Sequence, residues 1–430
     1  MNTLLVTFIG VFVMIGLLLG GMWIPFAIAI GGVLLLVLYE GVSSLNAIGF
    51  VAWGSLNSAT LSSIPLFILM SEILLRSGVS SRFYDGLSKF SWILPGGLLQ
   101  TNIAGCALFS AISGSSVATA AAIGSVAIPR AQEEGYDDSM TSASIAAGGT
   151  LGILIPPSIP LIIYASFAEV SIAQLFAAAL TPGILLALMF MGYIALRVLR
   201  DPSLAPKGKR PARLREYVFG MVEIFPILVL IGFVLGSIYL GLATATEAAA
   251  VGVFGSLAIA ALLGRPPLRV YFDASISSVK FSASLLFITL AAYIFAYAVD
   301  TTGLGVRLTD WVTSLGLNRI VFLLILFLMY AALGCIVDSI GMIVLTVPLL
   351  IPILVAMDIN LIWFGVMLIV VVELGLITPP MGINLFVVES IAKRGLATVI
   401  RGIVPYYFVI SIFVAILTVF PGISLWLARG

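Results

Sequence analysis

The 430-residue sequence has no histidine, only two cysteines and 9% charged residues. Without histidine there is no imidazole for a proton relay, a metal site or a Ser-His nucleophile. Cys106 and Cys335 stand in no C-x-x-C or other metal-ligand spacing, so we interpret both as small packing residues. Such a low charge content also excludes an ordinary soluble domain, in which about a quarter of the residues are charged.

Hydrophobic residues make up 61% of the chain, and its mean hydropathy is +1.23. An apolar stretch of about 20 residues crosses a bilayer as a helix, so the sequence predicts an all-α polytopic membrane protein. We expect the first stretch to be retained as a span, because it lacks the basic leader of a signal peptide. The predicted spans lie near residues 3–20, 23–40, 60–77, 138–168, 174–199, 217–241, 246–263, 281–299, 361–392 and 402–421.

A double-proline segment occurs twice in the chain. Residues 152–157 read GILIPP and residues 375–380 read GLITPP, at an offset of 223 residues. Two adjacent prolines inside an apolar stretch break a helix, because their rings remove hydrogen-bond donors and clash with the preceding turn. We therefore expect the helices at 138–168 and 361–392 to be broken.

The repetition extends beyond the prolines. At an offset of 225 residues, three residues of the first half recur in the second: Gly78, Arg82 and Asp85 return as Gly303, Arg307 and Asp310. The sequence therefore predicts two related repeats, residues 1–205 and 216–430, joined by a basic connector at 206–215. Secondary transporters are commonly built in this way, with the binding site where interrupted helices of the two repeats meet.

Each repeat also contains an apolar segment divided by a polar break. Residues 113–116 (SGSS) divide the segment at about 95–130, and residues 338–341 (DSIG) divide the segment at about 319–356. Because each arm is short for a full crossing at about 1.5 Å per residue, we interpret both segments as re-entrant helical hairpins. Irregular backbone at membrane depth is tolerated only where protein or a water-filled cavity surrounds it.

An odd number of spans in each repeat turns the second repeat over relative to the first, so the repeats are predicted to be inverted. The connector carries Lys207, Lys209, Arg210, Arg213 and Arg215 and is placed in the cytoplasm by the positive-inside rule. This orientation puts 17 of the 20 basic residues on the cytoplasmic side. Both termini are then predicted to be periplasmic.

Opening a helix inside the membrane frees backbone carbonyls, which suit Na⁺, and helix N-termini, which suit an anion. We predict one site where residues 113–116 meet 152–158, and a second where 338–341 meet 375–384. An acid at membrane depth costs about 2.5–3.5 kcal/mol on insertion scales, so Asp338 is predicted to bind or balance a cation. Glu373 is either a second functional acid or a partner of a scaffold group, and we interpret Glu72, Glu223 and Glu389 as residues near span ends.

These segments, together with Gly148-Gly149 and the stretch TPPMGIN at residues 378–384, resemble the large membrane subunit of a TRAP (tripartite ATP-independent periplasmic) transporter. The resemblance covers essentially the whole chain. It implies an elevator mechanism, Na⁺ as coupling ion with no other cofactor, and a location in the bacterial inner membrane. It also implies three partners besides the lipid bilayer: a small membrane subunit of about four spans, a periplasmic binding protein and a small carboxylate-bearing solute. No nucleic-acid partner is expected.

The resemblance assigns residues to two sodium sites and one solute site. The first sodium site draws on Ser113, Ser116, Gly152, Ile155 and Pro157. The second draws on Asp338, Gly341, Gly375, Thr378 and Met381. For the solute we expect contacts with Ser115, Ser116, Ser158, Ser339 and Asn384.

Three other functions fit parts of the pattern. A stand-alone Na⁺/dicarboxylate carrier shares the hairpins and needs no binding protein. An intramembrane hydrolase would use a hairpin serine, with lysine in place of the missing histidine, but the predicted topology places no lysine at the midplane. A channel would conduct without the saturation that transport shows.

Overall fold

The computed structural model describes residues 3–206, 214–335, 337–380 and 382–428. Helices form all the regular secondary structure of these residues, which confirms the all-α prediction. The long helices of the first half are α1 (Thr3–Leu19), α2 (Ile24–Glu40), α3 (Leu45–Leu56), α4 (Ala59–Arg76), α5 (Val79–Ser88), α6 (Leu98–Ser113), α7 (Ser116–Glu133), α8 (Asp138–Thr150), α9 (Ile159–Ala168) and α10 (Ile172–Arg200).

The second half repeats this succession of helices. It contains α11 (Leu214–Tyr239), α12 (Ala245–Ile259), α13 (Leu268–Thr301), α14 (Leu304–Ser314), α15 (Arg319–Gly334), α16 (Ser339–Ala356), α17 (Leu361–Leu376), α18 (Ile383–Ala392), α19 (Leu396–Val419) and the short α20 (Gly422–Leu425). Single turns connect some of them: η1 (Val42–Ser44), η2 (Ser91–Ile93), η3 (Leu151–Ile153), η4 (Pro202–Leu204) and the π-turn η5 (Ala260–Gly264).

Within the described residues, seven helices are long and apolar enough to cross a membrane. They are α4, α10, α11, α12 with its π-turn, α13, α16 and α19. The presence of α16 in this group corrects one expectation, because this second arm of the second hairpin has 18 residues and is long enough to span by length alone. The remaining predicted spans are helices of 17 residues or are broken in two.

The two halves differ at one equivalent pair of helices. In the first half α3 and α4 are separate, because Asn57 and Ser58 interrupt the helix between them. In the second half α13 runs without a break for 34 residues. The span predicted at 281–299 is therefore too short, since nothing between Pro267, which precedes the helix, and Thr301 stops it.

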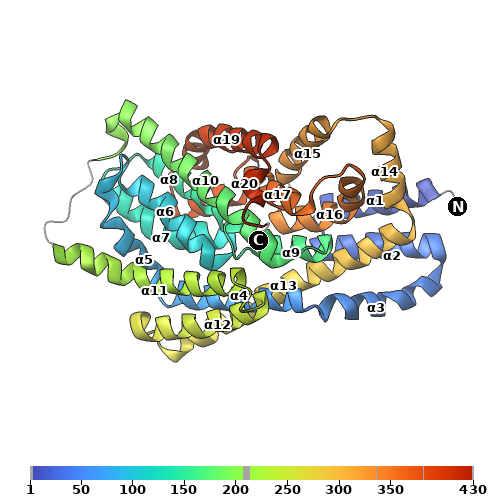
Figure 1. Ribbon diagram of the computed structural model, residues 1–430, viewed down its shortest axis with the longest axis horizontal. Helices are drawn as coiled ribbons and strands as arrows, with labels where there is room; N and C mark the ends of the chain where they lie inside the picture. Colours follow the sequence, from blue (N-terminus) through green and yellow to red (C-terminus); the bar gives the residue numbers. More distant parts are fainter. Residues whose placement is uncertain (1–2, 207–213, 336, 381, 429–430) are drawn as a thin grey trace.

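The helices lie in two layers (Figure 1). One layer contains α2, α3, α4, α11, α12 and α13, in which α4 packs against α12 and α13, and α2 packs against α1 and α13. The other contains both hairpins, both broken helices, α10 and α19. In this second layer α8 packs against α6, α7 and α19, while α17 packs against α15, α16 and α19. Below, the first is called the α4–α13 layer and the second the hairpin layer.

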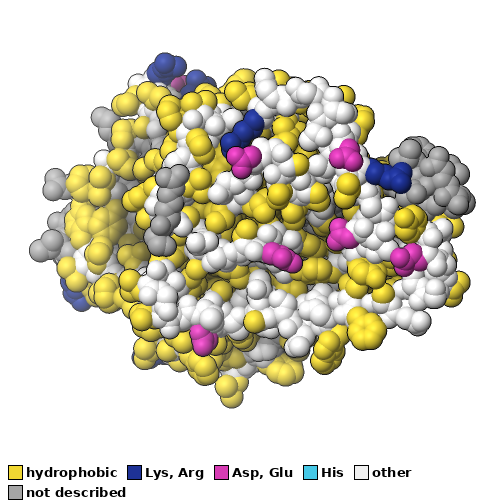
Figure 2. All heavy atoms as spheres, turned by 45° about the vertical axis from the view of Figure 1, so that its right-hand side comes forward, with side chains coloured by type: hydrophobic (Ala, Val, Ile, Leu, Met, Phe, Trp, Pro, Cys, Tyr) yellow, Lys and Arg dark blue, Asp and Glu magenta, His cyan; other side chains and the backbone are white. Residues whose placement is uncertain are grey.

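The outer surface is suited to lipid. Figure 2 shows one face on which hydrophobic side chains spread between sparse acidic and basic groups. Large apolar side chains such as Phe50, Trp53, Phe254 and Phe408 are well exposed. A water-soluble protein rarely exposes so continuous an apolar surface, so these faces are expected to contact lipid or another membrane subunit.

The predicted inversion of the repeats places the ends of the two hairpins on opposite sides of the membrane. Glu133 and Ala356 are the last residues of α7 and α16, stand at the 223-residue offset, and are both exposed. Single cysteines are placed at these positions in a chain with Cys106 and Cys335 replaced by alanine. A membrane-impermeant thiol reagent added to intact cells is expected to label the cysteine at 356 and not the one at 133, which should react only after the cells are opened. Labelling of both cysteines from outside would rule out the inversion.

Candidate functional site

The tip of the first hairpin rests directly on the first helix break. Gly114 ends α6 with a positive φ of 58°, which glycine adopts without strain. Ser115 caps α7 and accepts a hydrogen bond from the Ala118 N–H at 3.5 Å. Across the tip, the Ile159 N–H at the start of α9 donates to the Gly114 carbonyl at 3.3 Å. The structure thus brings residues 113–116 into contact with the end of the break at 152–158, where the sequence predicts that the two segments meet.

Gly152 lies where no side chain fits. A Cβ atom on it would be 2.5 Å from the Ser115 carbonyl oxygen and 2.8 Å from the Thr119 hydroxyl. The Thr119 hydroxyl also lies 2.5 Å from that of Ser113, and both side chains are buried. The Ser115 carbonyl oxygen and the Thr119 hydroxyl thus lie against the Gly152 backbone, and the Ser113 hydroxyl lies next to that of Thr119. Thr119 was missed at the sequence level, although its position one helical turn after Ser115 was a usable signal.

The first break also frees backbone carbonyls. Residues 154–158 are not helical, and the bond between Pro156 and Pro157 is cis. Among the described residues, nothing donates a hydrogen bond to the carbonyls of Ile155, Pro156 or Pro157. The Ile155 side chain packs away from the hairpin tip, toward Gly183 of α10. Oxygens of this kind, without N–H partners, are the ligands that hard cations such as Na⁺ bind.

The tip of the second hairpin differs from that of the first in having an acid, Asp338, where the first has a serine. Asp338 caps α16, and its carboxylate accepts hydrogen bonds from the N–H groups of Ile340 at 3.2 Å and Gly341 at 3.3 Å. It stands at the 223-residue offset from Ser115, the cap of α7. Asp338 therefore has a structural role in addition to the cation-binding role predicted for it. The negative charge of Asp338 offsets the positive partial charge at the N-terminus of α16. The N-terminus of α7, which is capped by the uncharged Ser115, keeps its positive partial charge.

Gly375, at the second break, is fixed by the end of α15. A Cβ on Gly375 would lie 2.6 Å from the Gly334 Cα, and a Cβ on Gly334 would lie 2.4 Å from the Gly375 Cα. The Thr378 hydroxyl donates to the Leu374 carbonyl at 2.6 Å, and the bond between Pro379 and Pro380 is cis. Met381 lies outside the described residues.

A cavity of about 550 Å³ separates the hairpin tips from the α4–α13 layer. Ser115 and Ser116 line it from the first tip, and Asp338 and Ser339 from the second. Ser116 and Ser339 stand at the 223-residue offset, are only 3% and 8% exposed, and have no side-chain hydrogen bond among the described residues. Three of the five predicted solute contacts, Ser115, Ser116 and Ser339, therefore meet at one cavity.

The other two predicted solute contacts lie elsewhere. The Ser158 side chain is fully buried, donates to the Ile153 carbonyl at 2.5 Å and caps α9. Asn384 is fully buried as well, and its amide donates to the Ala146 carbonyl at 3.3 Å. Neither side chain lines the cavity between the tips, so both act as internal supports of the helix breaks in this arrangement.

The opposite wall of the cavity was not found from the sequence. It is formed by Trp23 and Ile24 at the start of α2, Glu72 and Leu75 of α4, and one side of α13. Trp23 and the residues of α13 stand in apolar runs that resemble lipid-facing helix surface, so no pattern marked them. Glu72 had been interpreted as a residue near a span end, and its carboxylate pairs with Arg76 at 2.6 Å.

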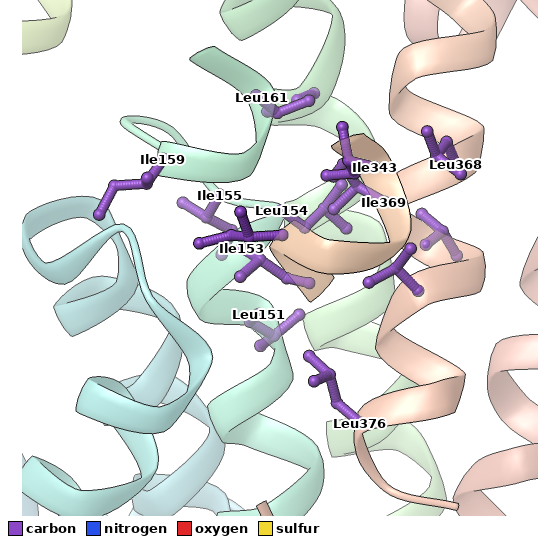
Figure 3. Close-up of a cluster of buried hydrophobic side chains, with 14 of the residues drawn as sticks. Leu151, Ile153, Leu154, Ile155, Ile159, Leu161, Ile343, Leu368, Ile369 and Leu376 are labelled. Carbon is purple, nitrogen blue, oxygen red and sulfur yellow. The ribbon is translucent and has the colours of Figure 1, made fainter. Parts of the chain in front are cut away.

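A cluster of buried apolar side chains joins the two breaks behind the tips (Figure 3). Leu154 from the first break lies close to Ile343 of α16 and Ile369 of α17, and Leu151 and Ile155 belong to the same cluster. This packing holds the first break against elements of the second half. It also explains why both breaks stay fixed although their own backbone hydrogen bonds are lost.

Glu373 is buried beside this cluster. Its side chain is fully buried, and neither carboxyl oxygen has a hydrogen bond among the described residues. Thr150, which stands at the 223-residue offset, lies beside it but donates its own proton to the Ala147 carbonyl at 2.7 Å. Because Glu373 does not line the cavity, the acids that face the cavity are Asp338 and Glu72.

Comparison with known proteins places this geometry in context. Residues 11–423 match the family described as "Tripartite ATP-independent periplasmic transporter, DctM component". A C4-dicarboxylate TRAP transporter large permease of Pseudomonas aeruginosa is 34% identical over 409 residues, which cover 93% of each chain. A sialic acid TRAP transporter large permease of Vibrio cholerae is 30% identical, with 97% of each chain covered.

Two further similarities extend this comparison. An isethionate TRAP transporter permease, DctMQ, of Oleidesulfovibrio alaskensis is 29% identical over 94% of this chain and 64% of its own length. The crystal structure of the YdaH transporter of Alcanivorax borkumensis superposes with a TM-score of 0.68 over 90% of both chains at 17% identity. At that identity the likeness concerns the fold alone.

Proposed function

The chain belongs to the DctM component family of tripartite ATP-independent periplasmic transporters, and from this premise we propose that it imports a small carboxylate-bearing solute in symport with Na⁺. Like these relatives, which are large permease subunits, it is a transport component and not an enzyme. We propose that it works in the bacterial inner membrane with a four-span membrane subunit and a periplasmic binding protein. The membership also favours this assembly over a stand-alone carrier.

One observation carries the proposal of Na⁺ coupling. Each hairpin tip lies at one cavity, and in the first half the tip closes on a break whose carbonyls have no N–H partner among the described residues. We propose that Na⁺ binds between Ser113, Thr119 and the backbone at Gly152, Ile155 and Pro157. The second ion would bind between Asp338 and the break at Gly375 and Thr378. Bound Na⁺ would then prepare the tips for an anionic solute.

We propose that the hairpin layer moves against the α4–α13 layer, as in an elevator. The two layers are in contact where α4 packs against α6 and α9 and where α13 packs against α16. One contact away from the cavity is made by Tyr293 of α13, whose ring stacks on Phe167 of α9 with centroids 4.5 Å apart. The Tyr293 hydroxyl also lies 2.5 Å from that of Ser166. Breaking this hydrogen bond costs only about 1 kcal/mol, so it does not by itself prevent sliding of one layer past the other.

Uptake into proteoliposomes tests the proposal. The chain, reconstituted with its membrane partner and binding protein, is expected to accumulate the labelled carboxylate only when Na⁺ is higher outside than inside. A proton gradient without Na⁺ is expected to give background uptake, since no histidine relay is present. Equal uptake with the proton gradient alone would overturn the assignment of the coupling ion.

A further inference from the structure

The part of the chain that the structure describes places no basic side chain at the cavity between the hairpin tips. Among the described residues that line it, none is lysine or arginine, and two are acids, Asp338 and Glu72. The Glu72 carboxylate is already paired with Arg76 at 2.6 Å. The Asp338 carboxylate is held by the N–H groups of Ile340 and Gly341. An anionic solute in this cavity is therefore bound without a guanidinium or ammonium group.

Among the described residues, only the first tip offers free donors without an acid at the start of its helix. The 18-residue helix α7 begins at Ser116, whose side chain lines the cavity; the residue is 3% exposed and its hydroxyl has no partner among the described residues. The N–H groups of Ser116 and Val117 are likewise not donated to another group there. At the other tip, Asp338 accepts hydrogen bonds from the N–H groups of Ile340 and Gly341 and places a carboxylate at the start of α16. The start of α7, whose cap is a serine and not an acid, is therefore the more favourable of the two places for a carboxylate.

The rest of the cavity is mostly apolar. On α13 it is lined by Phe281, Leu285 and Ile288 together with the small polar Ser277 and Ser284, and Trp23 also lines it. Trp23 is held in place by Phe26 and Phe287, with ring centroids 5.7 Å away from each. From the hairpin layer, Ile153, Ile159 and Ile340 add further apolar surface. Apolar parts of a ligand that fill this space make its binding free energy more favourable, because they are removed from water against apolar walls.

From these observations we propose that the solute is a monocarboxylate with an apolar body, such as a branched-chain or aryl-substituted carboxylic acid. Its carboxylate binds at the start of α7, beside Ser115 and Ser116, and its body lies against Phe281 and Trp23. A dicarboxylate is disfavoured, because its second charge would meet Asp338, apolar wall or the uncharged Ser277 and Ser284, and no basic partner. This inference rests on the proposed function, in which the cavity holds the transported carboxylate.

The test compares two acids with the same number of non-hydrogen atoms, 4-methylpentanoate and succinate. The purified full-length chain is titrated with each acid at saturating Na⁺, and binding is measured from the rise in its thermal unfolding midpoint. We expect 4-methylpentanoate to bind at least about tenfold more tightly than succinate. Na⁺-dependent binding of succinate that is equal or tighter overturns the inference and leaves the proposed function standing. If neither acid binds at any Na⁺ concentration, both fail.

A matched pair of variants tests the apolar wall. Phe281→Ser removes a ring from the cavity, whereas Phe272→Ser removes one from the same helix at a position that does not line it. The first variant is expected to lose about tenfold in 4-methylpentanoate affinity while its stabilisation by Na⁺ alone is unchanged. The second is expected to bind like the wild type. Equal affinities in all three proteins contradict the placement of the solute body.

Discussion

Replacing Gly152 with alanine is expected to reduce Na⁺-driven uptake by about 100-fold. The added Cβ would lie 2.5 Å from the Ser115 carbonyl oxygen and 2.7 Å from its carbon. These are backbone atoms, so the hairpin tip itself must move away from the break. Misplacement of reacting groups by about 1 Å costs about that factor in enzymes, and a cation held by several oxygens is expected to be as sensitive. Uptake by the reconstituted complex measures the loss.

A matched glycine provides the control. Gly192 lies inside α10, and a Cβ there would meet no atom within 4 Å. Gly192→Ala adds the same methyl group to a membrane helix and is expected to transport like the wild type. Gly375→Ala, whose Cβ would lie 2.6 Å from the Gly334 Cα, is expected to behave like Gly152→Ala. Wild-type uptake by Gly152→Ala would show that the tip and the break do not form the ion site.

The positions of the tips and breaks followed from the sequence because each has a strong local cause. Proline cannot donate a backbone hydrogen bond, so the helices end beside residues 156–157 and 379–380. Ser115 and Asp338 are favourable N-caps, and α7 and α16 begin directly after them. In the same way, the 223-residue offset paired residues such as Ser116 and Ser339 that the fold brings to one cavity.

What the sequence did not reveal depends on long-range packing. The contact between Gly334 and Gly375 joins two glycines among the 42 of the chain, and no local pattern distinguishes this pair from other small residues. Trp23 and Phe281 face a cavity, yet in sequence they resemble lipid-facing residues. The unbroken α13 depends on the absence of any helix-breaking residue at the position equivalent to Asn57 and Ser58. The roles of the tips as ion sites stay a prediction.

The second large effect is expected at Asp338, where charge and capping are separable. Asparagine caps a helix about as well as aspartate does, so Asp338→Asn is expected to keep α16 in place. It removes the formal negative charge that we assign to the second Na⁺ site. Asp338→Ala removes the cap as well and is expected to cost a further ~1 kcal/mol of stability. Of the two, only the asparagine variant isolates the effect of charge.

Equilibrium binding of radioactive Na⁺ to the purified chain tests the central claim most directly. The wild type is expected to bind Na⁺ saturably, without competition from K⁺. Asp338→Asn is expected to lower the affinity of one class of site by at least about tenfold, as loss of one charge-assisted contact implies, while the protein remains folded. Absence of saturable Na⁺ binding in the wild type, or unchanged binding in Asp338→Asn, would contradict the assignment of Na⁺ to the hairpin tips.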